Sequence, residues 1–258
     1  MSGARRVRRL GRCVGACLFA CAGTLPGHAL ADPNDYVLTL DITAGEREFD
    51  AKLGAATHTP AGSPAAQAAA LAWGAGITDY WMTELYAQFA NPVAGSGGGG
   101  FDAVSWENVL RFNEPGRWPL DLGATLELER PRFASEGWKY TLGPLLQADI
   151  DDIQVNANLL FTRTLGGAEA GPLLLGYQFQ IKYRAAARFE YGLQGLGDMG
   201  PWKSFTHATA ASQRLGPAIF GRYKLGPGRS LGYNAALLLG TTAHAPERTL
   251  RAQLDFEY

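Results

Sequence analysis

Apolar and polar residues alternate one by one over long stretches of the chain. Between Leu173 and Arg184, apolar residues take every odd position, and Gln, Lys or Arg take the last four even positions. Leu120–Arg130 and Ile153–Arg163 follow the same rule. A helix would scatter these residues around its circumference, whereas a strand sorts them onto two faces. The pattern therefore predicts β-strands with one apolar and one polar face.

The same alternation predicts twelve strands, an even number, as in single-chain bacterial membrane barrels. Residues typical of turns, namely Gly, Pro, Asn and Asp, separate the strands. The expected strands are Glu46–Ala56, Ala68–Thr78, Trp81–Ala90, Phe101–Phe112, Leu120–Arg130, Trp138–Asp149, Ile153–Arg163, Leu173–Arg184, Arg188–Gly197, Arg214–Lys224, Leu231–Thr241 and Arg248–Tyr258.

The connections between these strands alternate between short and long. Short ones lie at Asp79-Tyr80, Asn113–Trp118, Asp151-Asp152, Ala185–Ala187 and Gly226–Arg229. Longer ones lie at His58–Gln67, Asn91–Gly100, Pro131–Gly137, Leu165–Gly171, Asp198–Ser212 and Thr242–Glu247. Short periplasmic turns and longer outer loops are typical of outer-membrane barrels, so we expect both chain ends in the periplasm.

Composition agrees with a membrane-embedded sheet. Charged residues make up 18% of the 258 residues, below the roughly 25% that is usual for soluble chains. No later stretch reaches about 18 uninterrupted apolar residues, which excludes a transmembrane helix. In lipid, only a closed sheet then satisfies the backbone hydrogen bonds. We expect an all-β fold: an up-and-down antiparallel transmembrane β-barrel of about 12 strands over residues 46–258.

The N-terminus is typical of a secretory signal peptide. Five arginines between Arg5 and Arg12 precede an apolar stretch, and Ala29-Leu30-Ala31 is a small-x-small cleavage signal. We expect residues 1–31 to be removed before Asp32, which leaves a formal net charge of -6. A net acidic product argues against nucleic acid as a partner.

All three cysteines, Cys13, Cys17 and Cys21, lie inside this segment. The mature chain then has no disulfide and no thiolate chemistry. Lipidation is the alternative interpretation, because Leu18-Phe19-Ala20-Cys21 is similar to a lipobox. Phe19 is atypical for that motif, and the Ala29-Leu30-Ala31 site competes with it.

Residues 32–45 precede the first expected strand. Tyr36, Leu38, Leu40 and Ile42 alternate weakly there. The pattern leaves three alternatives open: a disordered periplasmic lead, an extension of the first strand, or a small plug inside the barrel.

Aromatic residues gather near the strand ends, and the last strand, Arg248–Tyr258, ends in an aromatic residue. With the signal peptide and the loop rhythm, this ending resembles that of bacterial outer-membrane β-barrels. Gly45–Asp50, Thr83–Tyr86 and Glu127–Pro131 are similar to segments of poorly characterised, porin-like or channel-like proteobacterial barrels. The resemblance implies contact with outer-membrane lipid, and recognition by the barrel-assembly machinery through the strand that ends in Tyr258.

A barrel would direct the polar face of each strand into its lumen, where charges must be hydrated or paired. We expect the following residues to line it: Glu84, Glu107, Arg111, Glu127, Glu129, Lys139, Asp149, Lys182, Arg184, Arg188, Glu190, Arg222, Lys224, Arg251 and Asp255. Such a wall favours a passive channel for small polar or amphipathic solutes, without a cofactor. The alternative is a salt-bridged network that only fills the interior, because twelve strands lie between filled and open barrels.

Catalytic and metal-binding patterns are weak. His58, His207 and His244 fall in expected loops at long spacings, so we predict no metal site. No histidine lies in an expected strand, which disfavours a Ser–His barrel hydrolase acting on lipids, and we expect no enzyme. A closed barrel with a structural role, or one that binds partners through loop aromatics such as Trp202 and Phe205, remains the main alternative.

Overall fold

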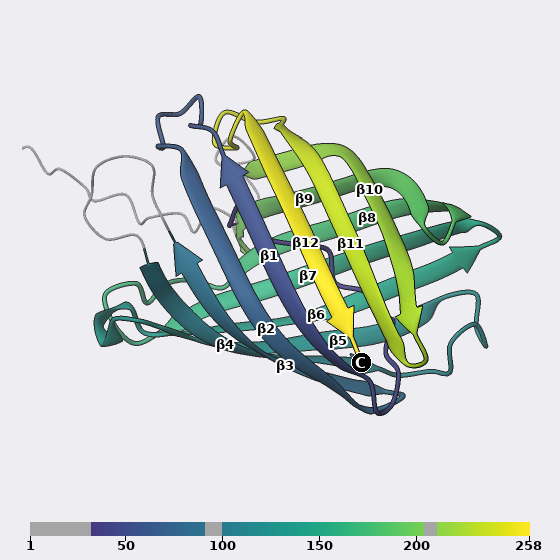
Figure 1. Cartoon of the computed structure of the whole chain (residues 1–258). Helices are drawn as coiled ribbons and strands as arrows, with labels where there is room; N and C mark the ends of the chain where they lie inside the picture. Colours follow the sequence, from purple (N-terminus) through teal and green to yellow (C-terminus); the bar gives the residue numbers. More distant parts are fainter. Residues whose placement is uncertain (1–31, 91–99, 204–210) are drawn as a thin grey trace, which may run out of the picture.

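The protein folds as one closed antiparallel β-barrel (Figure 1), seen here in a computed structural model that describes residues 32–90, 100–203 and 211–258. Its strands are β1 (Arg47–Ala56), β2 (Ala66–Thr78), β3 (Trp81–Ala90), β4 (Gly100–Arg111), β5 (Asp121–Pro131), β6 (Trp138–Ile150), β7 (Ile153–Leu165), β8 (Leu174–Ala186), β9 (Phe189–Pro201), β10 (Ser212–Gly226), β11 (Arg229–Gly240) and β12 (Arg248–Glu257). Each strand pairs with its neighbours in sequence, and β1 pairs with β12. The predicted signal peptide lies outside the described residues.

The twelve-strand prediction is confirmed. The bounds of β3 agree to the residue, and most others differ by one or two. The largest difference is in β9, which continues through a glycine-rich stretch to Pro201. Gly195 and Gly197 are typical of turns in a sequence, but here they make room for aromatic rings. A Cβ at Gly195 would lie 2.1 Å from the Phe179 ring, and one at Gly197 would lie 2.2 Å from the Tyr177 ring.

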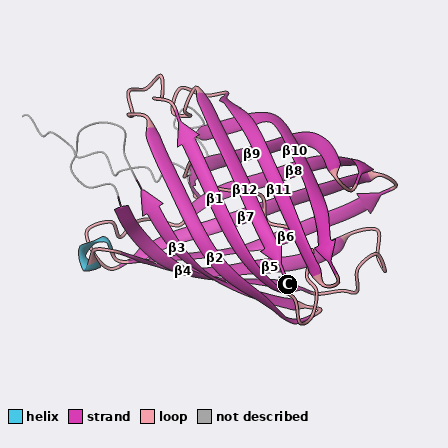
Figure 2. Cartoon of the chain, in the orientation of Figure 1, coloured by secondary structure: helices cyan, strands magenta, loops and turns pink. Residues whose placement is uncertain are grey.

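The two ends of the barrel differ, as the connection lengths predicted. At one end, which we call the turn end, β6 and β7 are joined by Asp151 and Asp152 alone. At the other, the loop end, a longer connection carries the short 3₁₀ helix Ala134–Glu136 (Figure 2). Strand β12 runs toward the turn end (Figure 1), where the amide of Tyr258 donates a hydrogen bond to the carbonyl of Arg47.

The outer face of the barrel is apolar and exposed. Leu53, Leu71 and Leu250 are each exposed by 57% or more, although they sit in the middle of a regular sheet. Aromatic pairs border this belt at both ends: Phe49 stacks on Tyr258 at the turn end, and Phe89 packs edge-on against Phe101 at the loop end. Such a belt with two aromatic borders is the surface that lipid requires. Among the described residues, no helix has the length and apolar character needed to cross a membrane.

A charge on this outer face should therefore destabilise the barrel according to its depth. Leu71 lies in the middle of β2, whereas Ile77 lies at the turn end of the same strand, and both are exposed. We expect Leu71→Arg to lower the free energy of unfolding in lipid vesicles by about 2–4 kcal/mol, and Ile77→Arg by at most about 1 kcal/mol. Urea titration of both variants checks this. Equal costs at the two depths would contradict a lipid-facing surface.

Residues 32–44, which we call the plug, run in extended form through the lumen. Val37, Leu38, Leu40 and Ile42 are 1–6% exposed. The backbone of the plug approaches the wall closely: a Cβ at Gly76 would lie 2.0 Å from the Thr43 carbonyl oxygen, and one at Gly54 would overlap Pro33. Gly76 is near the turn end and Gly54 is near the loop end. The plug thus runs from the loop half of the barrel, where Asp32 and Pro33 lie, to the turn end. The expectation that both ends of the mature chain lie at the turn end holds for Tyr258 and is wrong for Asp32.

Candidate functional site: the lumen and its plug

The predicted lumen residues divide into buried and peripheral groups. Glu84, Glu107, Arg111 and Arg251 are 4–7% exposed inside the barrel. Glu127, Glu129, Lys139, Lys182, Glu190 and Asp255 are partly buried on inward faces. Asp149, Arg184, Arg222 and Lys224 lie near the turn end, where Arg184 pairs with Asp149 at 2.9 Å and Arg222 pairs with Asp255 at 3.9 Å. Arg188 differs from the prediction: β9 begins at Phe189, so Arg188 lies exposed in the preceding turn.

Polar side chains of the wall hold the backbone of the plug. The Leu38 amide donates to Gln178 Oε1 at 3.1 Å, and the Leu40 amide donates to Gln147 Oε1 at 2.9 Å. In return, Asn158 donates to the Leu38 carbonyl and Arg111 donates to the Leu40 carbonyl, both at 2.9 Å. These side chains come from β4, β6, β7 and β8. They supply the partners that a buried strand edge needs.

A chain of amides crosses the same part of the lumen. Asn156 donates to Gln147 at 2.8 Å, Gln180 donates to Asn156 at 3.3 Å, and Gln194 donates to Gln180 at 2.6 Å. Arg251 of β12 completes the chain with a 2.8 Å bond to Gln194. Because each member is buried and partnered, the chain fixes these side chains in place. These amides are not among the predicted lumen residues, although they share the inward positions of the charged ones.

Apolar side chains of the wall pack against the plug on two sides. Leu38, Leu40 and Ile42 contact Val109 and Leu145. Val37 contacts a second cluster, formed by Leu196, Ala218, Phe220, Ala236 and Leu238. The alternating pattern predicts a polar inner face, but the inner face also contains these apolar side chains. Apolar inward positions occur where the plug passes, and there they exclude water.

Lys52 holds the plug at mid-height. Its Nζ lies 3.0 Å from Asp50 Oδ2, 2.6 Å from Tyr86 Oη and 3.1 Å from the centre of the Tyr36 ring. Tyr36 in turn donates to Glu107 at 2.7 Å. The ammonium group is thus enclosed by a carboxylate and two phenol rings, a combination that favours cations.

Above Lys52, a cavity of about 540 Å³ extends toward the loop end. The plug residues Tyr36 and Leu38 form part of its floor, and Asp102, Glu136 and Lys139 contribute to its rim. Arg214 lies beside it, only 1% exposed, with its guanidinium 3.9 Å from Asp35. Arg214 is not among the predicted lumen residues, although it lies on the same face of β10 as Arg222.

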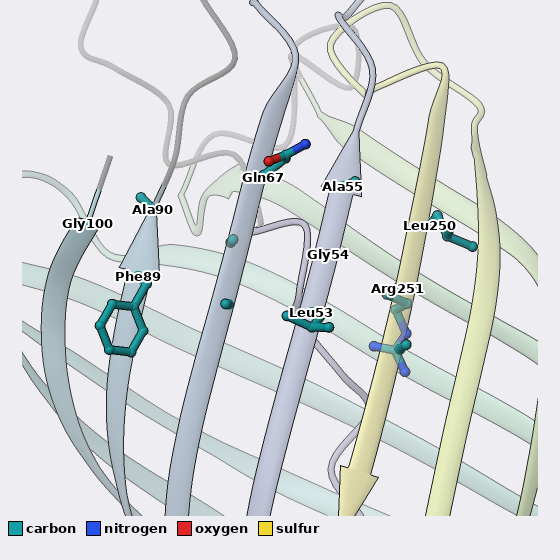
Figure 3. Close-up of a pocket in the computed structure, with 12 residues that line it drawn as sticks. Leu53, Gly54, Ala55, Gln67, Phe89, Ala90, Gly100, Leu250 and Arg251 are labelled. Carbon is teal, nitrogen blue, oxygen red and sulfur yellow. The ribbon is translucent and has the colours of Figure 1, made fainter. Parts of the chain in front are cut away.

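A second cavity, of about 720 Å³, lies on the outside of the barrel (Figure 3). It is mostly apolar and extends from β12 across β1, β2 and β3 to the start of β4. Ala55, Ala69 and Ala252 replace the larger residues of the belt there. Leu53 and Leu250, both about 60% exposed, border it. This hollow faces lipid and is not part of the lumen.

The residues weighed for metal or catalytic chemistry do not come together. His58 lies 3.8 Å from Glu247 between two loops, and both side chains are exposed. Across the described ranges, no group of three or more His, Cys, Asp or Glu side chains is placed to hold a metal ion. Ser204, Phe205 and His207 lie outside the described residues.

Comparisons with known proteins place the chain by its fold. No protein-family model and no curated protein matches the sequence. Among solved structures, an outer membrane channel from Pseudomonas putida F1 matches with a TM-score of 0.58 and 12% identity, over 88% of this chain and 98% of that one. A KdgM porin (TM-score 0.52) and a NanC porin (0.51) each match at 11% identity, over 82% of this chain and 98% of theirs. At such low identity the likeness concerns the fold alone: this chain has the barrel fold of outer-membrane porins and channels.

Proposed function

We propose that the protein is an outer-membrane barrel that acts as a passive channel for small polar or amphipathic solutes. The observation that carries the proposal is the cavity of about 540 Å³, which is lined by charged side chains inside a barrel with an apolar outer belt. Solute would diffuse along this wall without a chemical step or energy coupling. The shared fold with porins and channels supports the same interpretation.

The proposal includes an orientation and a route of export. The loop end faces the outside of the cell and the turn end faces the periplasm, following the rule for connection lengths. Residues 1–31 direct export and are then removed. The strand that ends beside Tyr258 presents its edge to the barrel-assembly machinery before it pairs with β1.

The plug sets the expected size of the current. It occupies the turn half of the lumen with packed apolar side chains, so ions that enter the cavity must pass beside it or wait for it to shift. We expect the intact protein to give small, discrete current steps in planar lipid bilayers. A correctly inserted barrel that carries no current and no solute flux, with the plug and without it, would refute the channel function.

One observation favours a second candidate, a closed barrel with a structural or loop-binding role. The plug and the chain of amides together fill the middle of the lumen with satisfied polar groups. In that case, shortening the loop-end connections would abolish function in cells, whereas substitutions in the lumen would leave it unchanged. The channel function predicts the opposite result.

A further inference from the structure

The loop-end cavity carries a large excess of negative charge. Nine carboxylate side chains line it, and Lys52 and Lys139 are the only lysines or arginines among the described residues of its wall, so its side chains carry a formal charge of -7. The α-ammonium group that the predicted cleavage would leave on Asp32, which also lines the cavity, adds one positive charge. Carboxylates gathered in a concave, partly desolvated space attract cations more strongly than the same charges on a flat surface. The cavity therefore favours positively charged solutes.

The protein neutralises few of these carboxylates itself. Lys139 Nζ lies 3.3 Å from Glu129 Oε1, and the Arg214 guanidinium lies 3.9 Å from Asp35. Lys52 pairs with Asp50, which is not among the residues that line the cavity. Asp102, Glu127 and Glu136 have no ion-pair partner within the described ranges. Lys139 and Lys52, the two lysines of this wall, offset only part of the mutual repulsion of these carboxylates, so a cation that enters would be attracted.

A buried hydroxyl in the same wall also lacks a partner. Thr125 is only 1% exposed, lines the cavity, and its Oγ1 makes no hydrogen bond to the described residues. It lies on the inward face of β5, two residues before Glu127. Leaving a buried hydroxyl unpaired is costly, so the site gains from a ligand that hydrogen-bonds there. An ammonium group, which only donates, suits this oxygen and the carboxylates beside it.

Lys52 shows that the cavity accommodates an alkylammonium group. Its Nζ contacts the Tyr36 ring at 3.1 Å and the Tyr86 hydroxyl at 2.6 Å, on the floor of the cavity. A solute ammonium that descends past Asp102 and Glu136 at the rim would next meet the carboxylates of Glu129 and Glu127. These residues lie two positions apart on one strand, about 6.6 Å along its axis. That spacing suits amines separated by three or four methylenes.

We propose that the loop-end cavity is a binding site for linear organic polyammonium compounds of the polyamine class. The binding of polyamines to the cavity does not depend on the proposed channel function. Their passage through the barrel rests on that function. The site takes the solute through the carboxylates of Glu129 and Glu127 and the hydroxyl of Thr125, above the aromatic floor that the Lys52 ammonium group already occupies. It disfavours anions.

Two substitutions at one ion pair test the proposal, with spermidine as the probe. Calorimetric titration of the detergent-solubilised full barrel should give about fivefold weaker binding for Glu129→Gln, and about fivefold tighter binding for Lys139→Met, because a partly exposed charge contributes up to about 1 kcal/mol. Both substitutions break the same Glu129–Lys139 contact. A merely structural effect would shift both affinities in one direction, and that result would overturn the proposal.

Further probes define the ligand class. Citrate should not bind, and Mg²⁺ should bind more weakly than spermidine. Equal binding of citrate, or binding of Mg²⁺ alone, would overturn the assignment.

Bilayer recordings separate this inference from the channel function. If spermidine binds as described but no current flows, the channel fails and the binding site stands. If current flows without spermidine binding or cation preference, the site fails and the channel stands.

Discussion

A protein that lacks residues 34–44 should carry an ionic current at least about tenfold larger than the intact protein, since a twelve-strand barrel is wider than the side-chain-filled eight-strand type. Asp32 and Pro33 are kept so that the predicted signal cleavage is unchanged. The barrel should persist, because its strands pair with one another around the full circle and not through the plug. Arg111 and Arg251, which contact the plug backbone, would then be hydrated by the water that replaces it.

Planar bilayer recordings measure this effect, and heat-modifiable migration on gels confirms that the barrel has folded. A control variant replaces residues 34–44 by glycine and serine at unchanged length. It retains a chain inside the lumen but loses the packed contacts, so it should also conduct more than the intact protein. Equal currents in all three proteins would show that the plug does not limit the flux.

Leu40→Asp should release the plug while leaving the barrel closed. Leu40 is 1% exposed and packs against Val109 and Leu145. A carboxyl group there loses the apolar contacts and finds no adequate solvation, a cost of about 3 kcal/mol or more, which lowers the ratio of docked to released plug by over a hundredfold. Thr39→Asp is the matched control, since Thr39 is partly exposed beside it and should tolerate the charge.

The predicted mature chain has no cysteine, so a single one can report on the plug. Val37→Cys places a thiol of similar size at a position that is 5% exposed. Its reaction with a water-soluble maleimide should be slow alone, slow with Thr39→Asp, and at least about a hundredfold faster with Leu40→Asp, as the docking cost implies. Slow labelling in the Leu40→Asp protein would show that the plug stays in place.

The wall of the barrel was predictable from sequence because one physical constraint acts on every strand. Lipid lies on one side and the lumen on the other, so side chains obey a period of two, as between Trp81 and Ala90. The residues typical of turns predict the ends of the strands less accurately. Arg188 has the inward parity of Glu190, but it lies in the turn before β9 and not in the strand. The glycines near the end of β9 are typical of turns, so the alternation predicts an end at Gly197 although the strand continues to Pro201.

The arrangement of the plug was not predictable in the same way. Val37 and Leu38 are both buried although they are adjacent, so the segment has no clean period. Its partners, among them Leu145 and Leu196, lie on distant strands and become neighbours only when the sheet curls. The sequence therefore predicted the candidate site only as a set of charged side chains on the inner face of the barrel. The hydrogen bonds among its amides, its apolar contacts and the two tyrosines around Lys52 depend on tertiary contacts that the alternation does not reveal.

The placement of the plug constrains the order in which the protein assembles. The seam between β1 and β12 joins the strands that lie furthest apart along the chain. The plug directly precedes β1, where the Gly45 amide bonds to Gly76 of the neighbouring strand. The plug contacts strands all round the barrel, including β1 through Lys52 and β12 through Arg251. Such a segment takes its place most readily while the seam is still open, before the lumen is enclosed. The sheet would then close around the plug that precedes β1. If the barrel closed first, the plug would have to enter the finished lumen through one of its ends as an extended peptide.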